Sequence, residues 1–354
     1  MSFLGLRLEK RESVSPGLKV IAPILTAILA LAASGALIRV AGGDPLLSLQ
    51  AIGVGAFGSM QNLGETLVKA SALVLVGLGM VLAFRSKVAN IGGEGQLIMG
   101  AVAATWIGLS LEGQPFALVF PLVLVGAFGA GAAWGAIAGW LKARLELNEV
   151  IVTIMLNYLA IYTLNWLVRG PMRAPGLAGG FPQSQALAEA IWWPRFPGTR
   201  LHLGVLLALV LAFLVSFFLF KTPWGYRLRA VGANPQAARY GGINVGRMIV
   251  LAMVLSGGLV GIAGASEIYG LHHRLLDGIS SGYGYTGIVV ALLGKLNPFG
   301  TIVASIFFAA LAVGMEAMQR SLGTPFALIS SIQGLVVLLM LLSDVVIEYR
   351  IRRA

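Results

Sequence analysis

Three polar residues, Glu149, Thr153 and Asn157, follow one another at four-residue intervals through an otherwise apolar stretch. This spacing puts their side chains along one face of a helix. At 1.5 Å per residue, Asn157 lies about 12 Å beyond Glu149, which is deep in a hydrocarbon core of about 30 Å if the helix crosses a membrane. Polar side chains at that depth usually face a bundle interior or a water-filled path. We therefore take the three residues, with the neighbouring Tyr158, as candidates for lining a path. An interhelical hydrogen bond is an equal alternative for Asn157 and the preferred one for Thr153.

A second polar group, Asn90, Glu94 and Gln96, lies in a segment that contains three glycines between positions 92 and 95. Glycine in a helix interior is destabilising, so a broken or re-entrant element is expected here. Irregular backbone at membrane depth survives only against protein or water, which makes these side chains further path candidates. The alternative is a helix N-terminus, where Glu94 in the first turn would favour the helix dipole. Gln333, in the middle of the last apolar stretch, is also a candidate.

Small residues are spaced for close helix packing in two other stretches. Gly131, Gly135 and Gly139 recur every four residues, and Gly257 and Gly261 do the same. Such faces let the backbones of membrane helices approach each other closely. A fainter pattern is the glycine-rich start of 282–287, which echoes the segment at 92–95 and hints at an inverted repeat.

A polar segment at 221–247 contains the start and stop signals of a very short helix. Asn234 is a good N-cap and Pro235 suits the first helical position. Gly241 and Gly242 can end the helix by adopting the left-handed conformation. A helix of one and a half turns is marginal by itself. The segment is either an ordinary capped loop or a rigid knob, with a face kept slim by Ala237 and Ala238, that sits in a groove of a soluble partner.

The residues that would carry enzymatic chemistry are missing from the sequence. It has no cysteine and only three scattered histidines, so neither a thiolate nucleophile nor a metal site is expected. Neither a G-x-x-x-x-G-K-[ST] phosphate loop nor an H-E-x-x-H motif is present. We predict that the chain is not an enzyme, binds no cofactor itself and cannot hydrolyse ATP.

The composition is that of a membrane protein. Of the 354 residues, 58% are hydrophobic and only 11% are charged, against about 25% charged in a typical soluble domain. The net charge of +11 comes from Lys and Arg in short loops between apolar stretches. This pattern is typical of the positive excess that orients membrane proteins, rather than of a nucleic-acid surface.

Apolar stretches predict an all-α, polytopic membrane helix bundle with about ten transmembrane helices. Between a tail at 1–17 and a tail at 348–354, a single membrane domain covers 18–347, with an outer loop at 169–200 and an inner loop at 221–247. The outer loop is interpreted as an interfacial segment or as a docking surface for an external partner. The expected spans are 18–40, 66–84, 96–111, 115–141, 149–168, 201–220, 248–270, 283–294, 298–318 and 325–347.

The distribution of basic residues predicts that both termini are cytoplasmic. With ten spans, only eight of the 25 Lys and Arg residues fall outside, and an excess of basic residues marks the cytoplasmic side. The short stretch at 283–294 must then cross the membrane, shielded by protein. The outer basic residues are Arg39, Lys69, Arg169, Arg173, Arg195, Arg200, Arg274 and Arg320.

Four motifs in order resemble the permease subunits of bacterial nucleoside and simple-sugar ABC importers. Residues 90–100, NIGGEGQLIMG, are similar to the "NIG-EGQ" motif of the nucleoside branch, although Gly93 stands where that family favours Ala. Residues 148–158, NEVIVTIMLNY, resemble its "NEVI-TIMLNY" motif, and 282–294 resemble its "GYG-GI-VALLG" segment. The segment 232–243, GANPQAARYGGI, looks like the coupling-helix signature. The resemblance assigns ATPase coupling to Gly232, Asn234, Pro235, Ala237, Ala238, Arg239, Gly241, Gly242 and Ile243.

The resemblance implies a multi-pass protein of the bacterial plasma membrane that forms a translocation path with a second, homologous permease chain. It also implies an ATPase subunit that carries ATP and Mg, an extracytoplasmic substrate-binding lipoprotein, and a small-molecule substrate, with a nucleoside expected. The same role for a simple sugar or another small ring compound is the alternative. An ion-coupled secondary transporter is disfavoured, because it would need an intramembrane carboxylate relay.

Overall fold

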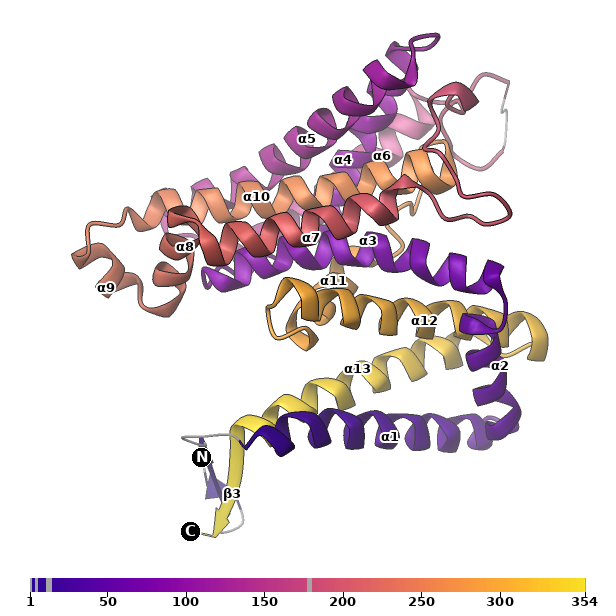
Figure 1. The fold of residues 1–354 in the computed structure, drawn as a ribbon. Coiled ribbons are helices and arrows are strands. Elements are labelled where there is room, and N and C mark those ends of the chain that lie inside the picture. The colour runs from indigo at the N-terminus through magenta and orange to yellow at the C-terminus, as the bar shows by residue number, and fades with distance from the viewer. Residues whose placement is uncertain (1, 4–5, 11–14, 177–179, 354) are drawn as a thin grey trace. The chain divides into compact units, whose positions relative to one another are not determined.

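The computed structural model describes residues 2–3, 6–10, 15–176 and 180–353 and divides into two compact units. One unit comprises Gly64–Ala309, and the other comprises Met1–Leu63 together with Ala310–Ala354. Almost every predicted element is a helix in the structure (Figure 1). The boundary between the units falls within two helices, α3 (Met60–Arg85) and α12 (Pro298–Leu322).

The larger unit is helical throughout its described regular elements, and α10 packs along α5 and α4 in its centre (Figure 1). Its elements between α3 and α12 are α4 (Gly93–Ser110), α5 (Phe116–Leu145), α6 (Glu149–Arg169), the 3₁₀ turn η1 (Glu189–Ile191), α7 (Leu203–Lys221), α8 (Pro223–Ala233), α9 (Pro235–Tyr240), α10 (Val245–Ser266), the π-helical turn η2 (Glu267–His272) and α11 (Tyr283–Leu293).

The predicted glycine faces make the contact between α5 and α10. A Cβ atom added to Gly131 would lie 2.2 Å from the carbonyl oxygen of Gly257, and one added to Gly261 would lie 2.2 Å from that of Ala127. Real Cβ atoms do not approach so closely, so only glycine allows this packing. The expected close approach of membrane helices at small residues is confirmed.

The described part of the outer segment, 169–176 and 180–200, belongs to the larger unit and packs within it. Trp193 is fully buried in a cluster with Leu187 and Ile191, and the ring of Trp192 stacks on His273 with 3.6 Å between centroids. The interfacial interpretation is therefore wrong for Trp193, which protein rather than lipid headgroups surrounds, while Trp192 is only partly buried.

The smaller unit pairs α1 (Pro16–Val40) with α13 (Phe326–Glu348), side by side (Figure 1). Between α1 and α3 lies α2 (Pro45–Phe57), whose first backbone N–H groups donate to Asp44. The sequence analysis missed α2, because thirteen residues reach only about 20 Å at 1.5 Å per residue.

The chain ends form a small antiparallel sheet of β1 (Ser2–Phe3), β2 (Leu6–Lys10) and β3 (Tyr349–Arg353), in the order β1-β2-β3. In its register Leu6 pairs with Arg353, and Lys10 pairs with Tyr349. The all-α prediction holds for the rest of the described chain and needs a correction only at the two tails, for which no strands were predicted. β3 supplies a strand partner from the far end of the chain, which no local pattern could indicate.

All ten predicted spans are helices, but length and composition support fewer crossings. Six described helices are long and apolar enough to cross a membrane, which makes this a multi-pass helical membrane protein. Ten crossings and two cytoplasmic termini remain predictions. Shorter apolar helices cover Ile28–Val40, Pro45–Phe57, Tyr283–Leu293 and Ala327–Met340, and the six long ones are Met60–Arg85, Phe116–Leu145, Glu149–Arg169, Leu203–Lys221, Val245–His272 and Pro298–Leu322.

Single cysteines introduced into this cysteine-free chain test the orientation. Gln185 and Phe196 belong to the predicted outer loop, Lys87 and Gln236 to the predicted inner side, and all four are exposed. In intact cells, an impermeant thiol reagent should label cysteine at 185 and 196 and reach 87 and 236 only after the membrane is opened. Labelling of position 236 in intact cells would reverse the orientation.

Candidate functional site

The backbone between α3 and α4 is irregular, as the glycines predicted. Residues 86–92 are not helical, and α4 starts at Gly93. Gly92 occupies the N-cap position, where it has no side chain to accept from the first N–H groups of α4. Asn90 turns back on its own segment, because its Oδ1 accepts a hydrogen bond of 2.9 Å from the N–H of Gly92. The sequence offered a broken element and a helix N-terminus as alternatives. The structure contains both: an irregular segment at 86–92 and, directly after it, the N-terminus of α4.

The polar stripe of α6 holds this irregular backbone. Glu149 Oε1 accepts from the N–H of Ala89 at 3.2 Å, and Thr153 Oγ1 accepts from that of Ile91 at 3.3 Å. Asn157 Oδ1 accepts from the N–H of Gly95 at 2.8 Å. Successive polar residues of α6, four apart, therefore bind two N–H groups of the irregular segment and one in the first turn of α4.

The side-chain amide of Asn157 also donates hydrogen bonds, so both its oxygen and its nitrogen have partners. Its Nδ2 donates to the carbonyl of Ile91 at 2.9 Å and reaches Tyr285 Oη at 3.4 Å. The residue is completely buried. These contacts support a structural role for Asn157 and Thr153.

A second set of bonds joins the segment to α10. Asn90 Nδ2 donates to Gln96 Oε1 at 3.0 Å and to Ser256 Oγ at 2.8 Å. Gln96 Nε2 donates back to Asn90 Oδ1 at 3.1 Å. All three side chains are buried. Ser256 was not singled out from the sequence, because a lone serine in an apolar helix gives no signal of a partner.

Glu94 links the starts of two helices. Its two carboxylate oxygens accept from the N–H groups of Gly282 at 3.2 Å and Gly284 at 2.9 Å, where α11 begins. A carboxylate at a helix N-terminus is favoured by the helix dipole. A Cβ on Gly284 would lie 2.1 Å from the backbone nitrogen of Glu94, so the two glycine-rich starts that echo each other in sequence touch in space.

We name the six buried residues of this region the polar cluster: Asn90, Glu94, Gln96, Glu149, Thr153 and Asn157. Each makes a hydrogen bond or ion pair within the chain, and Glu149 also pairs with Lys142. The arrangement can fix an irregular backbone but supplies no nucleophile with an adjacent base.

Two path candidates lie elsewhere. Tyr158 is 52% exposed, on a different face of α6 from the cluster, and Gln333 is a half-buried residue of α13 in the smaller unit. Whether any of the eight lines a path remains a prediction.

The inner loop folds into two capped helices, α8 and α9. Asn234 Oδ1 accepts from the N–H groups of Gln236 at 2.9 Å and Ala237 at 3.1 Å, as its N-cap position predicted. Gly242 ends the turn with φ +76°, and the N–H of Ile243 donates to the carbonyl of Ala238 at 3.0 Å. The predicted short helix is confirmed at both of its ends, but the left-handed conformation expected of both glycines occurs only at Gly242, since Gly241 has φ −76°.

The expected slim face is wrong for one of its two alanines. Ala238 is 6% exposed and packs against Leu228 and Val245 of its own chain, because the turn closed by Ile243 brings that side of α9 against α8 and α10. Ala237 is exposed. Tyr240, at the end of α9, is 95% exposed. The solvent face is made of Pro235, Gln236, Ala237, Arg239 and Tyr240.

The predicted outer side contains two buried histidines. Burial, followed by the charge of Arg195, lowers the pKa of His202 to about 4. Burial also lowers the pKa of His273 to about 4, with Arg195 the strongest of the nearby charges. Among the described residues, no group of three His, Cys, Asp or Glu side chains could hold a metal ion.

The fold and these segments define a multi-pass helical membrane protein with an irregular polar segment between α3 and α4. Residues 62–343 match the family described as the branched-chain amino acid transport system / permease component. The chain belongs to this family; it is an ABC transporter permease, a transport subunit of the plasma membrane.

Three curated relatives agree with this membership. The chain is 33% identical to a glucose ABC transporter permease of Haloferax volcanii, over 98% of this chain and 93% of the relative. It is 35% identical to a guanosine ABC transporter permease of Bacillus subtilis, over 89% and 91%. A nucleoside ABC transporter permease of Lactococcus lactis is 29% identical, over 85% of each.

Replacing Asn157 tests the structural role of the stripe. Asn157→Leu leaves the buried N–H of Gly95 without its acceptor, which should destabilise the protein by about 1–3 kcal/mol and lower its midpoint of thermal unfolding in detergent. Tyr158→Leu, the exposed neighbour, is the control and should change little. An unchanged midpoint for Asn157→Leu, combined with lost transport, would instead favour lining of the path.

The buried histidines predict acid sensitivity. Because the folded-state pKa of His202, about 4, lies below the usual value near 6.5, the unfolded state binds more protons as the pH falls from 6.5 towards 4. Stability is therefore full above pH 6.5 and should be lower by about 2 kcal/mol at pH 5. His202→Asn keeps a cap acceptor for Gly204 and should flatten the pH dependence of thermal unfolding; parallel curves would contradict the assignment.

Proposed function

We propose that this chain is the permease of an ATP-driven nucleoside importer and forms the translocation path with a second, homologous permease chain. The guanosine and nucleoside permeases among its relatives support this substrate class. The glucose permease keeps a simple sugar as the second candidate. The substrate would be delivered by an extracytoplasmic binding lipoprotein.

The observation that carries the proposal is the exposed face of α9. A six-residue helix fixed by Asn234 and by the turn at Gly242 presents Tyr240 almost fully to solvent. Large aromatic side chains frequently dominate the affinity of protein interfaces. We assign this face as the docking element for an ATPase subunit, which would bind the ATP and Mg that this chain has no motif to hold.

The buried carboxylates argue against an ion-coupled mechanism. Glu94 accepts from two backbone N–H groups, and Glu149 pairs with Lys142 and accepts from Ala89. Both carboxylates are thus engaged in contacts that fix the backbone and helix starts, and neither is part of a carboxylate relay of the kind that an ion-coupled transporter needs.

Adjacent alanines of α9 test the docking surface with matched chemistry. Ala237→Arg adds bulk and charge on the solvent face, so it should leave the thermal stability of the permease unchanged but abolish co-purification of the ATPase and uptake. Ala238→Arg places the same side chain against Leu228 and should lower stability and expression. Wild-type co-purification and uptake with Ala237→Arg would remove α9 from the interface.

Tyr240→Ser provides a second variant on the same face. Loss of a hot-spot aromatic weakens binding by about 2 kcal/mol or more, about 30-fold. If Tyr240 is such a residue, the affinity of the ATPase for the permease should fall by that order in a titration with purified subunits. Uptake of labelled guanosine and glucose by the complete wild-type complex then distinguishes the two substrate classes.

A further inference from the structure

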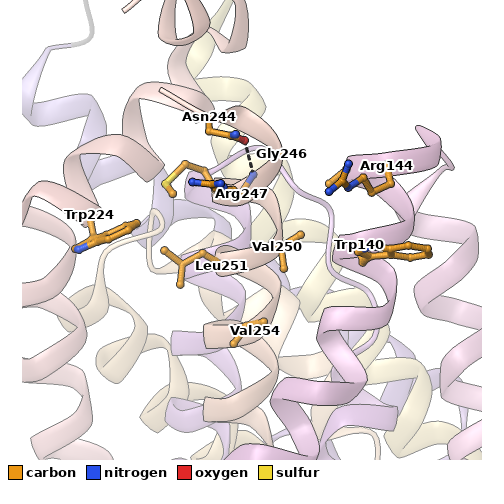
Figure 2. A pocket seen from close by; sticks show the side chains of 11 residues that line it. Trp140, Arg144, Trp224, Asn244, Gly246, Arg247, Val250, Leu251 and Val254 are labelled. Carbon is orange, nitrogen blue, oxygen red and sulfur yellow. Dashed lines mark hydrogen bonds between the residues drawn. The ribbon is translucent and has the colours of Figure 1, made fainter. Parts of the chain in front are cut away.

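A groove of about 670 Å³ lies between the end of α5 and the start of α10 (Figure 2). Trp224 of α8 forms one side and Trp140 of α5 the other. The groove is distinct from the exposed face of α9 and from the polar cluster, neither of which contributes a residue to its lining.

One end of the groove is basic. Arg144 of α5 and Arg247 of α10 line it, with Asn244 beside them, and both arginines are exposed. In the part of the chain that the structure describes, neither makes an ion pair, and no acidic side chain lines the groove. Arg227 adds a further positive charge, with its guanidinium carbon 5.1 Å from the centre of the Trp224 ring.

The other end is apolar. Val250, Leu251 and Val254 continue along α10 away from the arginines (Figure 2). From Arg247 to Val254 the helix rises about 10 Å at 1.5 Å per residue. One leaflet of the hydrocarbon core is about 15 Å thick, so this wall reaches well into it while the arginines remain at its edge.

The two tryptophans mark the level of the membrane surface. Trp140 is 53% and Trp224 is 49% exposed. Half-exposed tryptophan is typical of the boundary between acyl chains and headgroups. Guanidinium groups at this boundary can bind the oxygens of a phosphate through paired hydrogen bonds.

We propose that this groove binds one anionic diacyl phospholipid, with its phosphate between Arg144 and Arg247 and an acyl chain along Val250, Leu251 and Val254. The combination of a basic mouth, an apolar wall of leaflet depth and interfacial tryptophans fits an amphipathic anion. A free phosphate would leave the wall unused, and a zwitterionic lipid would carry an ammonium group towards the arginines. The inference requires only that these helix ends lie at a membrane surface, whichever substrate the permease carries.

Native mass spectrometry of the purified full-length protein, titrated with phosphatidylglycerol or phosphatidylcholine in mild detergent, tests the proposal. The wild type should bind one phosphatidylglycerol in preference to phosphatidylcholine. The double variant Arg144→Gln/Arg247→Gln should bind phosphatidylglycerol about 25-fold more weakly, taking about five-fold for each arginine at a membrane surface. Thermal unfolding of each variant verifies that the fold is intact.

The matched control is Arg39→Gln/Arg320→Gln, which removes the same charge from two exposed arginines elsewhere and should bind the lipid like the wild type. Equal loss in both double variants, or equal binding of phosphatidylcholine, would reduce the effect to net charge or to a lipid annulus and overturn the site. Displacement of the lipid by glycerophosphoglycerol at low millimolar concentration would make it a site for soluble phosphates. Loss of the lipid when the ATPase is added would show that the groove binds the ATPase in the complete complex, and this would overturn the lipid site.

Discussion

The structure depends on one constraint: every backbone N–H and C=O group within a membrane must find a partner inside the protein. Residues 86–92 leave the helix between α3 and α4, and helical hydrogen bonds no longer satisfy their backbone. The α6 stripe meets this need with side-chain acceptors for the N–H groups of Ala89 and Ile91, and it also binds that of Gly95 in the first turn of α4. The four-residue spacing of Glu149, Thr153 and Asn157 therefore follows from the positions of the donors that they bind.

The glycine seam between α5 and α10 makes room for the same cluster. A Cβ on Gly135 would lie 3.3 Å from Gln96 Nε2, and one on Gly257 would lie 3.4 Å from Gln96 Cδ. The small residues that allow close packing and the amide of Gln96 look independent in the sequence. In the structure they are in contact with each other. The glycines bring the helices together and also leave a place for Gln96 beside Asn90 and Ser256.

Sequence reasoning succeeded where the determining interactions are local. Asn234 and Gly242 act within a few residues, so the bounds of α9 could be predicted, and the four-residue period placed Thr153 and Asn157 on one face. Sequence reasoning failed where the structure is determined by contacts between residues far apart in the chain. The buried side of Ala238 is set by Leu228 and Val245, which a helix of six residues cannot indicate. The terminal sheet was out of reach for the same reason, since the partners of β2 include residues near the end of the chain.

The inner loop contacts the end of α3 and the start of the irregular segment that leads to the polar cluster. Lys87 Nζ donates to the carbonyl of Ala233, at the end of α8, at 3.3 Å. A Cβ on Gly232 would lie only 1.9 Å from the carbonyl oxygen of Arg85. The backbones of α8 and the last turn of α3 are therefore in direct contact, and no larger residue fits at position 232.

Arg85 in turn donates from Nε to the carbonyl of Leu296, just beyond α11, at 2.9 Å. The segment that begins at Ser86 reaches Asn90 within five residues, and Glu94 joins it to the start of α11. A force applied to α9 by a docked ATPase would therefore reach the broken segment through α8 and the end of α3. Because packed contacts of this kind shift between discrete arrangements rather than deform continuously, the irregular backbone that α6 stabilises is the part of the larger unit best placed to change with the state of the partner.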